Sequence, residues 1–363
     1  HNNVANNNPD HPDAQSVKSV KSESPLGNRT ENIKPYALFG DIDGDFYGKP
    51  LNTGDFTLKA PAYSETGGKG QAIGTENLDY SVVDVAQPQG SAIGEYGSLS
   101  LNHEWKTVSL DDSYDNPVVI VSDPTFNGSD AAVIRLQNIT DDSFQVRIQE
   151  PNYKDGTHTS ESVSYVVMEA GDWDLADGTR ISAGTHTADK LTSQGFDSVD
   201  ITGFESTPTV LSQIQTFNGL DWATTRTQGQ SATGFQMAMQ EEEARNSGSH
   251  IQETIGWLAV EDGTAFDGDT LMQGTTTGLS YDHSRSTVSF EADFDVAPSV
   301  IAKLGSFNGS DTANLRLDDI TSQSFGVRVH EEQSLDSEIN HNPEAIAFLA
   351  LEGQSGTLTG SVV

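Results

Sequence analysis

Residues 116–150 read NPVVIVSDPTFNGSDAAVIRLQNITDDSFQVRIQE, and the same pattern returns twice further along the chain. Residues 207–241 read TPTVLSQIQTFNGLDWATTRTQGQSATGFQMAMQE, and residues 297–331 read APSVIAKLGSFNGSDTANLRLDDITSQSFGVRVHE. The three segments align without gaps, and their shared prolines, Pro117, Pro208 and Pro298, lie 91 and then 90 residues apart. A fixed period of this length predicts one structural unit repeated three times.

Apolar and polar residues alternate near the end of each segment. The residues that share the apolar face are Phe144, Val146 and Ile148, then Phe235, Met237 and Met239, then Phe325, Val327 and Val329. A period of two is typical of a half-buried β-strand, and turn signals such as NITDDS separate the runs. The sequence therefore predicts an all-β protein with three tandem antiparallel β-sandwich repeats.

The repeats and the local composition also predict where the units begin and end. We expect a polar N-terminal tail over residues 1–35, a small β- and turn-rich module over 36–94, and sandwich repeats over 95–174, 175–265 and 266–363. The tail has little to bury, so alone it cannot offset the entropy cost of ordering. It is either disordered or held by another copy through strand addition to a sheet edge, which predicts self-association through residues 1–35.

The composition limits the environment and the partners. The chain carries 54 Asp and Glu against 19 Lys and Arg, a formal net charge of −35. This charge repels nucleic acids and anionic membrane surfaces, and it suits a high-salt or calcium-rich exterior. There is no cysteine, and no apolar run is long enough to cross a bilayer. We therefore expect a secreted, extracellular or cell-surface protein that binds no nucleic acid and does not insert into membranes.

A second set of repeated positions is polar. Each Phe-Asn-Gly triplet is followed by an Asp, an Arg, a Glu and a His-x-x-Glu pair. The members of this set are Asp130, Arg135, Glu150, His158 and Glu161, then Asp221, Arg226, Glu241, His250 and Glu253, then Asp311, Arg316, Glu331, His341 and Glu344. Such groups either bind sugar hydroxyls through paired hydrogen bonds or join neighbouring repeats through Arg–carboxylate pairs. The pattern alone leaves both interpretations open.

The repeat resembles the H-type lectin domain, the small β-sandwich of snail agglutinins and of the discoidin C-terminal domain. The resemblance rests on Pro117-Val118-Val119, on Thr233-Gly234-Phe235 and on the strand from Ile255 to Glu261. Members of that family form trimers that bind N-acetylgalactosamine-type sugars at subunit edges. The resemblance thus implies that the three copies pack as a pseudo-trimer.

The sugar site of that family does not carry over. Its aromatic-His pair after the central Phe is replaced here by Glu150-Pro151, Glu241-Glu242 and Glu331-Glu332. The leading hypothesis is nevertheless a lectin-like adhesion protein that binds glycans or cell-surface polysaccharide through several weak sites. The alternative is a structural subunit of an extracellular filament, sheath or virion, assembled through its N-terminal tail with calcium.

Calcium is the cofactor that the sequence predicts. Asp41, Asp43 and Asp45 alternate around Gly44, and carboxylates at a spacing of two can converge on a cation. The glutamate that would complete an EF-hand loop is Asn52 here. For catalysis, neither a G-x-S-x-G nor a phosphate-loop motif occurs, and we expect no enzyme activity.

Overall fold

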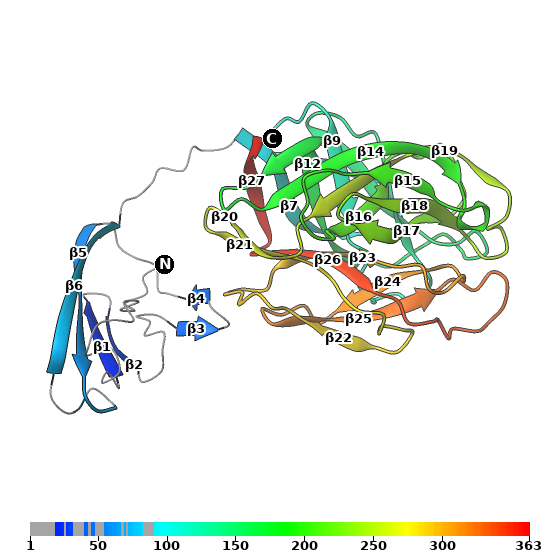
Figure 1. Ribbon diagram of the computed structural model, residues 1–363. Coiled ribbons are helices and arrows are strands. Elements are labelled where there is room, and N and C mark those ends of the chain that lie inside the picture. The colour runs from blue at the N-terminus through cyan, green and yellow to red at the C-terminus, as the bar shows by residue number, and fades with distance from the viewer. Residues whose placement is uncertain are drawn as a thin grey trace. The chain divides into compact units, whose positions relative to one another are not determined.

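The structure of the chain is a computed structural model that describes residues 19–24, 27–31, 40–42, 45–47, 54–66, 69, 72–82 and 91–363. They fall into two compact units, one within residues 1–86 and the other within residues 87–363. Apart from the short 3-10 turn η1 (Thr192–Gln194), the regular structure in the described part consists of β-strands in antiparallel sheets (Figure 1). The predicted all-β class with several sandwiches is confirmed. No helix in the described ranges is long and apolar enough to cross a membrane.

The first unit holds a four-stranded sheet in the order β2-β1-β5-β6 and a separate hairpin, β3-β4. The sheet strands are β1 (Ser19–Ser24), β2 (Gly27–Glu31), β5 (Gly54–Tyr63) and β6 (Ala72–Val82). Strands β1 and β2 lie in the segment expected to be a tail, but β1 pairs with β5 of the same chain, as in Val20 opposite Ala62. Backbone hydrogen bonds alone can add a polar strand to a sheet edge, so the polar composition does not prevent it. Residues 1–18 lie outside the described residues.

In the second unit, each repeat is a sandwich of two antiparallel sheets, one of which has three strands. The other sheet of repeat 3 has four strands, and those of repeats 1 and 2 are joined edge to edge in one eight-stranded sheet. The sheets of repeat 1 contain β7 (Ser91–Leu101), β12 (Glu161–Glu169) and β9 (Pro117–Val121), and then β8 (Lys106–Ser109), β11 (Ser143–Gln149) and β10 (Val133–Gln137). Those of repeat 2 contain β13 (Gly171–Asp174), β14 (Arg180–Lys190), β19 (Ser249–Val260) and β16 (Thr209–Ile214), and then β15 (Asp197–Asp200), β18 (Gly234–Glu241) and β17 (Ala223–Ser231). Those of repeat 3 contain β20 (Gly263–Asp267), β21 (Thr270–Thr276), β26 (Ile346–Leu351) and β23 (Ser299–Leu304), and then β22 (Ser286–Ser289), β25 (Ser324–Glu331) and β24 (Ala313–Asp318).

Each sandwich has its own core between its two sheets. In repeat 1 the predicted apolar face of Phe144, Val146 and Ile148 is buried there, and the matching residues of repeats 2 and 3 fill the other two cores. Burial of one such side chain contributes roughly 1.5–3 kcal/mol. The alternating strands thus account for the three sandwiches.

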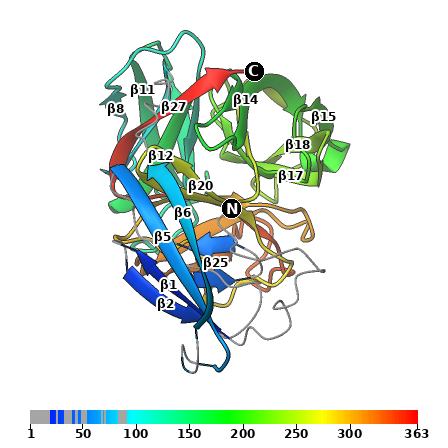
Figure 2. The ribbon, with the colours of Figure 1, turned by 60° about the vertical axis from the view of Figure 1, so that its left-hand side comes forward.

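The strand that opens each quoted segment does not alternate, because it is buried on both faces. Val119 and Val121 face the core of their own sandwich, whereas Val118 and Ile120 belong to a fourth cluster. That cluster also contains Leu211 of repeat 2 and Ile301 of repeat 3, the counterparts of Ile120. The larger sheets of the three repeats therefore pack against one shared central core. In Figure 2 the three-stranded sheets, marked by β11, β18 and β25, lie apart from one another.

The last strand of the chain completes the first repeat. Strand β27 (Ser355–Val362) pairs with β7, with Gly360 opposite Ser91, and on its other side it pairs with β13. In Figure 1 it is the red strand beside the C-terminus. Strands β13 and β20 hold the same place in repeats 2 and 3. The chain segment that follows one repeat therefore supplies a strand to the sheet of the next repeat in the ring. The sheets accordingly place β13 and β27 with the following repeat, not with the repeat whose predicted bounds contain them, and β20 crosses the predicted boundary between residues 265 and 266.

Candidate functional site

The repeated arginines lie at the contacts between repeats. Arg135, Arg226 and Arg316 are fully buried. Arg135 of repeat 1 donates hydrogen bonds to the carbonyl oxygens of Gly219 (3.1 Å) and Asp221 (2.6 Å), which belong to the Phe-Asn-Gly loop of repeat 2. The first arginine therefore reaches across to the second repeat.

The other two arginines repeat this contact in cyclic order. Arg226 of repeat 2 donates to the carbonyl of Ser306 (3.1 Å) and to Glu344 (2.5 Å) in repeat 3. Arg316 of repeat 3 donates to the carbonyl of Gly128 (2.9 Å) and to Glu161 (2.7 Å) in repeat 1. Three equivalent contacts close a ring of repeats, and we call each of them a joint.

Aromatic stacking reinforces each joint. The guanidinium carbons of Arg135, Arg226 and Arg316 lie 4.6, 4.9 and 5.0 Å from the ring centroids of Phe217, Phe307 and Phe126, respectively. These rings belong to the Phe-Asn-Gly triplets, and cation–π contacts at such distances are attractive. The repeated Phe is therefore a partner of the neighbouring repeat's arginine.

The Glu of the His-x-x-Glu pair is saturated with donors in repeats 1 and 3. Glu161 receives hydrogen bonds from the Thr125 hydroxyl (2.7 Å), the backbone amides of Asn127 (2.9 Å) and Gly128 (2.7 Å), the His158 imidazole (3.2 Å) and the Arg316 guanidinium. Glu344 of repeat 3 has the matching donors, with Arg226 of repeat 2 in the place of Arg316. The glycine of the triplet is required by packing, because a Cβ on Gly309 would lie 2.6 Å from His341. Such a carboxylate has no free lone pairs to offer a ligand.

The histidine of each pair bridges two carboxylates. His158 contacts Glu150 through Nδ1 (2.9 Å) and Glu161 through Nε2 (3.2 Å). Burial alone would lower the pKa of the matching His250, but its contacts with Glu241 and Glu253 raise that pKa to about 9. His250 is therefore protonated at neutral pH and carries a positive charge between the two carboxylates.

The carboxylates of the joints are correspondingly acidic. Burial raises the pKa of Glu253 and Glu344, but the hydrogen bonds from His250 and His341 and from the loops outweigh it and lower both values to about 2. The pKa of Glu161 is lowered for the same reasons. Each joint therefore contains an ionised network at neutral pH.

The repeated Asp differs between the copies. Asp130 forms an ion pair with Lys154 (2.6 Å), and Asp221 forms one with Arg245 (2.7 Å). Each of these basic residues follows the repeated Glu by four positions, and the corresponding residue of repeat 3 is Leu335. Asp311 instead lies near two further carboxylates.

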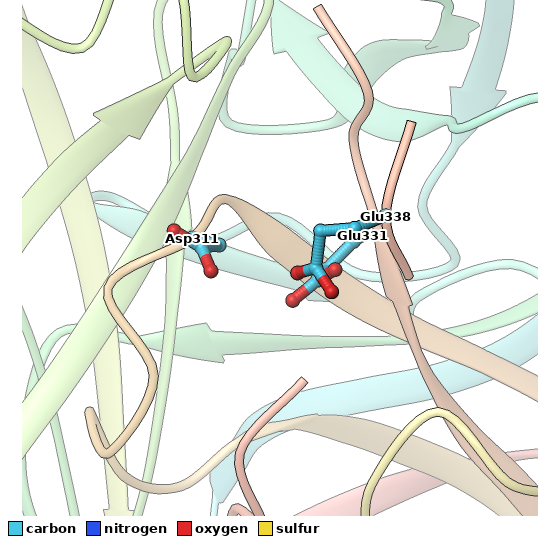
Figure 3. Close-up of side chains that lie close together, drawn as sticks. All are labelled: Asp311, Glu331 and Glu338. Carbon is cyan, nitrogen blue, oxygen red and sulfur yellow. The ribbon is translucent and has the colours of Figure 1, made fainter. Parts of the chain in front are cut away.

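Those carboxylates are Glu331 and Glu338, and one oxygen from each of the three residues lies within 4.8 Å of the others. We call this group the acidic corner; Figure 3 shows Glu331 and Glu338 turned toward Asp311. Burial and the negative charges of Asp311, Glu332 and Glu331 raise the pKa of the nearby Glu243 to about 8. The sequence pattern includes Asp311 and Glu331 but misses Glu338, which lies in a loop whose length differs between repeats.

The sequence also gives no signal for a buried polar cluster in which the three repeats meet. Lys303 pairs with Asp123 at 2.6 Å and donates to Gln213 at 3.1 Å, so all three repeats contribute to it. The positions that match Lys303 are Gln213 and Ser122, so no repeated pattern marks them. Conserved offsets cannot reveal contacts that break the symmetry.

The predicted calcium loop falls partly outside the described residues. Asp41 and Asp45 lie in β3 (Gly40–Ile42) and β4 (Asp45–Tyr47), where Asp45 is opposite Ile42 and Asp41 is opposite Phe46. Asp43 lies outside the described residues. Calcium at this loop stays a prediction.

A polar cavity of about 340 Å³ lies near the start of β20. Its walls include Asp177, Glu261 and Asp262, and no aromatic ring is among the residues that line it. Sugar sites commonly combine polar groups with an aromatic surface. This cavity therefore adds little support for glycan binding.

Comparison with known proteins gives one informative match. The chain resembles a small part of a halomucin. It is 30% identical to Halomucin of Haloquadratum walsbyi over 294 residues, which cover 76% of this chain and 3% of that protein. No family model matches the chain, and no solved structure does.

Proposed function

We propose that the chain is a structural, non-catalytic part of an extracellular surface layer, in which the three repeats form one closed and rigid body. The observation that carries this proposal is the use of the repeated polar set inside the molecule. Arg316 has no exposed surface, and its guanidinium is fully occupied by repeat 1. Because the repeated polar side chains already bind one another at the joints, they support assembly of the ring and leave few hydrogen-bonding groups for a sugar.

The way the chain enters and leaves the ring is consistent with this role. Ser91 at the start of β7 lies opposite Gly360 near the end of β27. A domain whose ends lie together can be inserted into a longer chain without disturbing its neighbours. The ring would then project from the chain at one point.

The charge and the relative fit the same environment. A net charge of −35 keeps a protein solvated and apart from its neighbours, and high salt screens the resulting repulsion within it. The similarity to a halomucin is compatible with a secreted surface protein. The chain spans about 3% of that relative, so the activities of the whole relative are not transferred to it.

Multivalent glycan binding is the second candidate. The observation that favours it is the cyclic contact among three repeats, an arrangement that the resemblance to H-type lectins implies and that allows several weak sites to act together. One experiment separates the two candidates. The labelled chain is applied to a glycan array that includes N-acetylgalactosamine-terminated sugars, at both low and molar salt. The structural proposal expects no signal that free sugar can compete away, and competed binding would overturn it in favour of a lectin.

A further inference from the structure

The acidic corner has the composition of a site for a hard cation. Three carboxylates with oxygens within 4.8 Å of one another repel strongly unless a proton or a cation lies between them. In the part of the chain that the structure describes, no ion pair joins Asp311 or Glu338 to a basic side chain. The equivalent aspartates of repeats 1 and 2 do have a basic partner: Asp130 pairs with Lys154, and Asp221 pairs with Arg245.

A second observation concerns the buried member of the group. The side chain of Glu331 is 1% exposed, and its Oε1 is 2.6 Å from Nδ1 of His341. Its Oε2 is buried and has no hydrogen-bond partner among the described residues. In repeat 1 the equivalent oxygen, Oε2 of Glu150, accepts a hydrogen bond from the backbone amide of Gly156 at 3.2 Å. A buried carboxylate oxygen without a donor is costly, and a metal ion would satisfy it.

We propose that Asp311, Glu331 and Glu338 bind a calcium ion, which takes the place that Lys154 and Arg245 fill in the other two repeats. Calcium binds oxygen ligands at about 2.3–2.6 Å, so oxygens on opposite sides of one ion lie about 4.6–5.2 Å apart. Oxygens within 4.8 Å of one another can therefore all bind one such ion. Magnesium needs about 2.0–2.1 Å and a regular octahedron, whereas calcium accepts flexible coordination, which suits three carboxylates from separate segments.

The site joins three parts of repeat 3. Asp311 belongs to the Phe-Asn-Gly loop, Glu331 ends β25, and Glu338 belongs to the following loop. Because Glu331 also holds His341, which contacts the joint carboxylate Glu344, the ion would stabilise the joint with repeat 2. This inference does not depend on the proposed surface-layer function.

Calorimetric titration of calcium into the chelator-treated full chain tests the site. The Glu338→Gln variant removes one ligand, and the Glu104→Gln variant is a matched control because Glu104 is an exposed acid in another repeat. We expect one binding event to weaken at least tenfold in Glu338→Gln and to remain in the control. Titration also separates this event from any binding at the predicted Asp41 loop, which Glu338→Gln leaves intact.

A second variant covers the case in which Glu338→Gln perturbs the loop. Leu335→Lys places a basic side chain where Lys154 and Arg245 stand, and Leu335 is 70% exposed, so the change is tolerated. We expect this variant to lose the rise in melting temperature that calcium gives the unaltered chain. The proposal is overturned if the unaltered chain shows neither binding heat nor a shift in melting temperature. It is equally overturned if the calcium response persists unchanged in both variants.

Discussion

Glu344 and Glu331 lie on either side of the same imidazole, His341, but they differ in what else they contact. Glu344 also receives hydrogen bonds from the guanidinium of Arg226 and the amide of Gly309. Burial raises the pKa of Glu344, but the hydrogen bond from His341 and these donors lower it to about 2. Glu331 retains a buried oxygen without a partner among the described residues, and its pKa is raised, first by burial. The difference shows that the donors around a repeated carboxylate decide whether it serves as a structural link or remains available to a ligand.

Removal of residues 355–363 should have the largest effect, because it removes the strand that closes the ring. The deletion removes β27, exposes the edges of β7 and β13, and takes away the fully buried Leu358. Loss of a buried Leu side chain alone costs about 2–5 kcal/mol, and the backbone pairs of the strand are lost as well. We expect β7 to lose its protection in hydrogen exchange and the unfolding transition to broaden or split.

The control for this deletion lacks only the exposed Val363. It should unfold with nearly the same midpoint in urea as the complete chain. A deletion of β27 that left both the midpoint and the protection of β7 unchanged would contradict ring closure by the last strand.

Arg226→Ala should have the next largest effect. It leaves Glu344 buried without its guanidinium partner, and removal of one member of a buried ion pair costs about 3–5 kcal/mol. Arg245→Ala is the matched control, because Arg245 forms an exposed pair with Asp221. That pair should contribute less than about 1 kcal/mol. Urea denaturation of both variants measures the difference, and equal losses would show that the joint is not a buried linkage.

Acid should weaken the joints in a defined range of pH. The pKa of Glu344 is about 2 in the folded chain and 4.5 as its ordinary value, so its contribution is complete above pH 4.5 and is lost as the pH falls toward 2. A shift of this size corresponds to about 3 kcal/mol. We expect the free energy of unfolding to fall between pH 4.5 and 2 more steeply in the unaltered chain than in Glu344→Gln. Equal slopes would contradict the proposed ionisation of the joint.

The sequence predicted the sandwich repeats because alternating residues such as Phe144 and Val146 depend on local period alone. It also predicted that Arg135, His158 and Glu161 matter together, since their offsets recur. It did not predict that Arg135 contacts the next repeat, because sequence spacing within one repeat carries no information about its neighbours. Strand β27 lacks the Phe-Asn-Gly segment that marks a repeat, and its role depends on a contact with β7, at the other end of the ring.

The smallest predicted effect compares the same substitution at two matched positions. Asp221→Asn removes an ion pair with Arg245 and should destabilise the chain by about 0.2–1 kcal/mol. Asp311→Asn removes a charge that faces Glu331 and Glu338, so in chelator it should stabilise the chain by a similar amount. In saturating calcium, Asp311→Asn should destabilise the chain instead, because the substitution then removes a ligand of the ion. Thermal melts of both variants with and without calcium give the four values, and identical signs for the two positions in chelator would show that the acidic corner is no different from its counterparts.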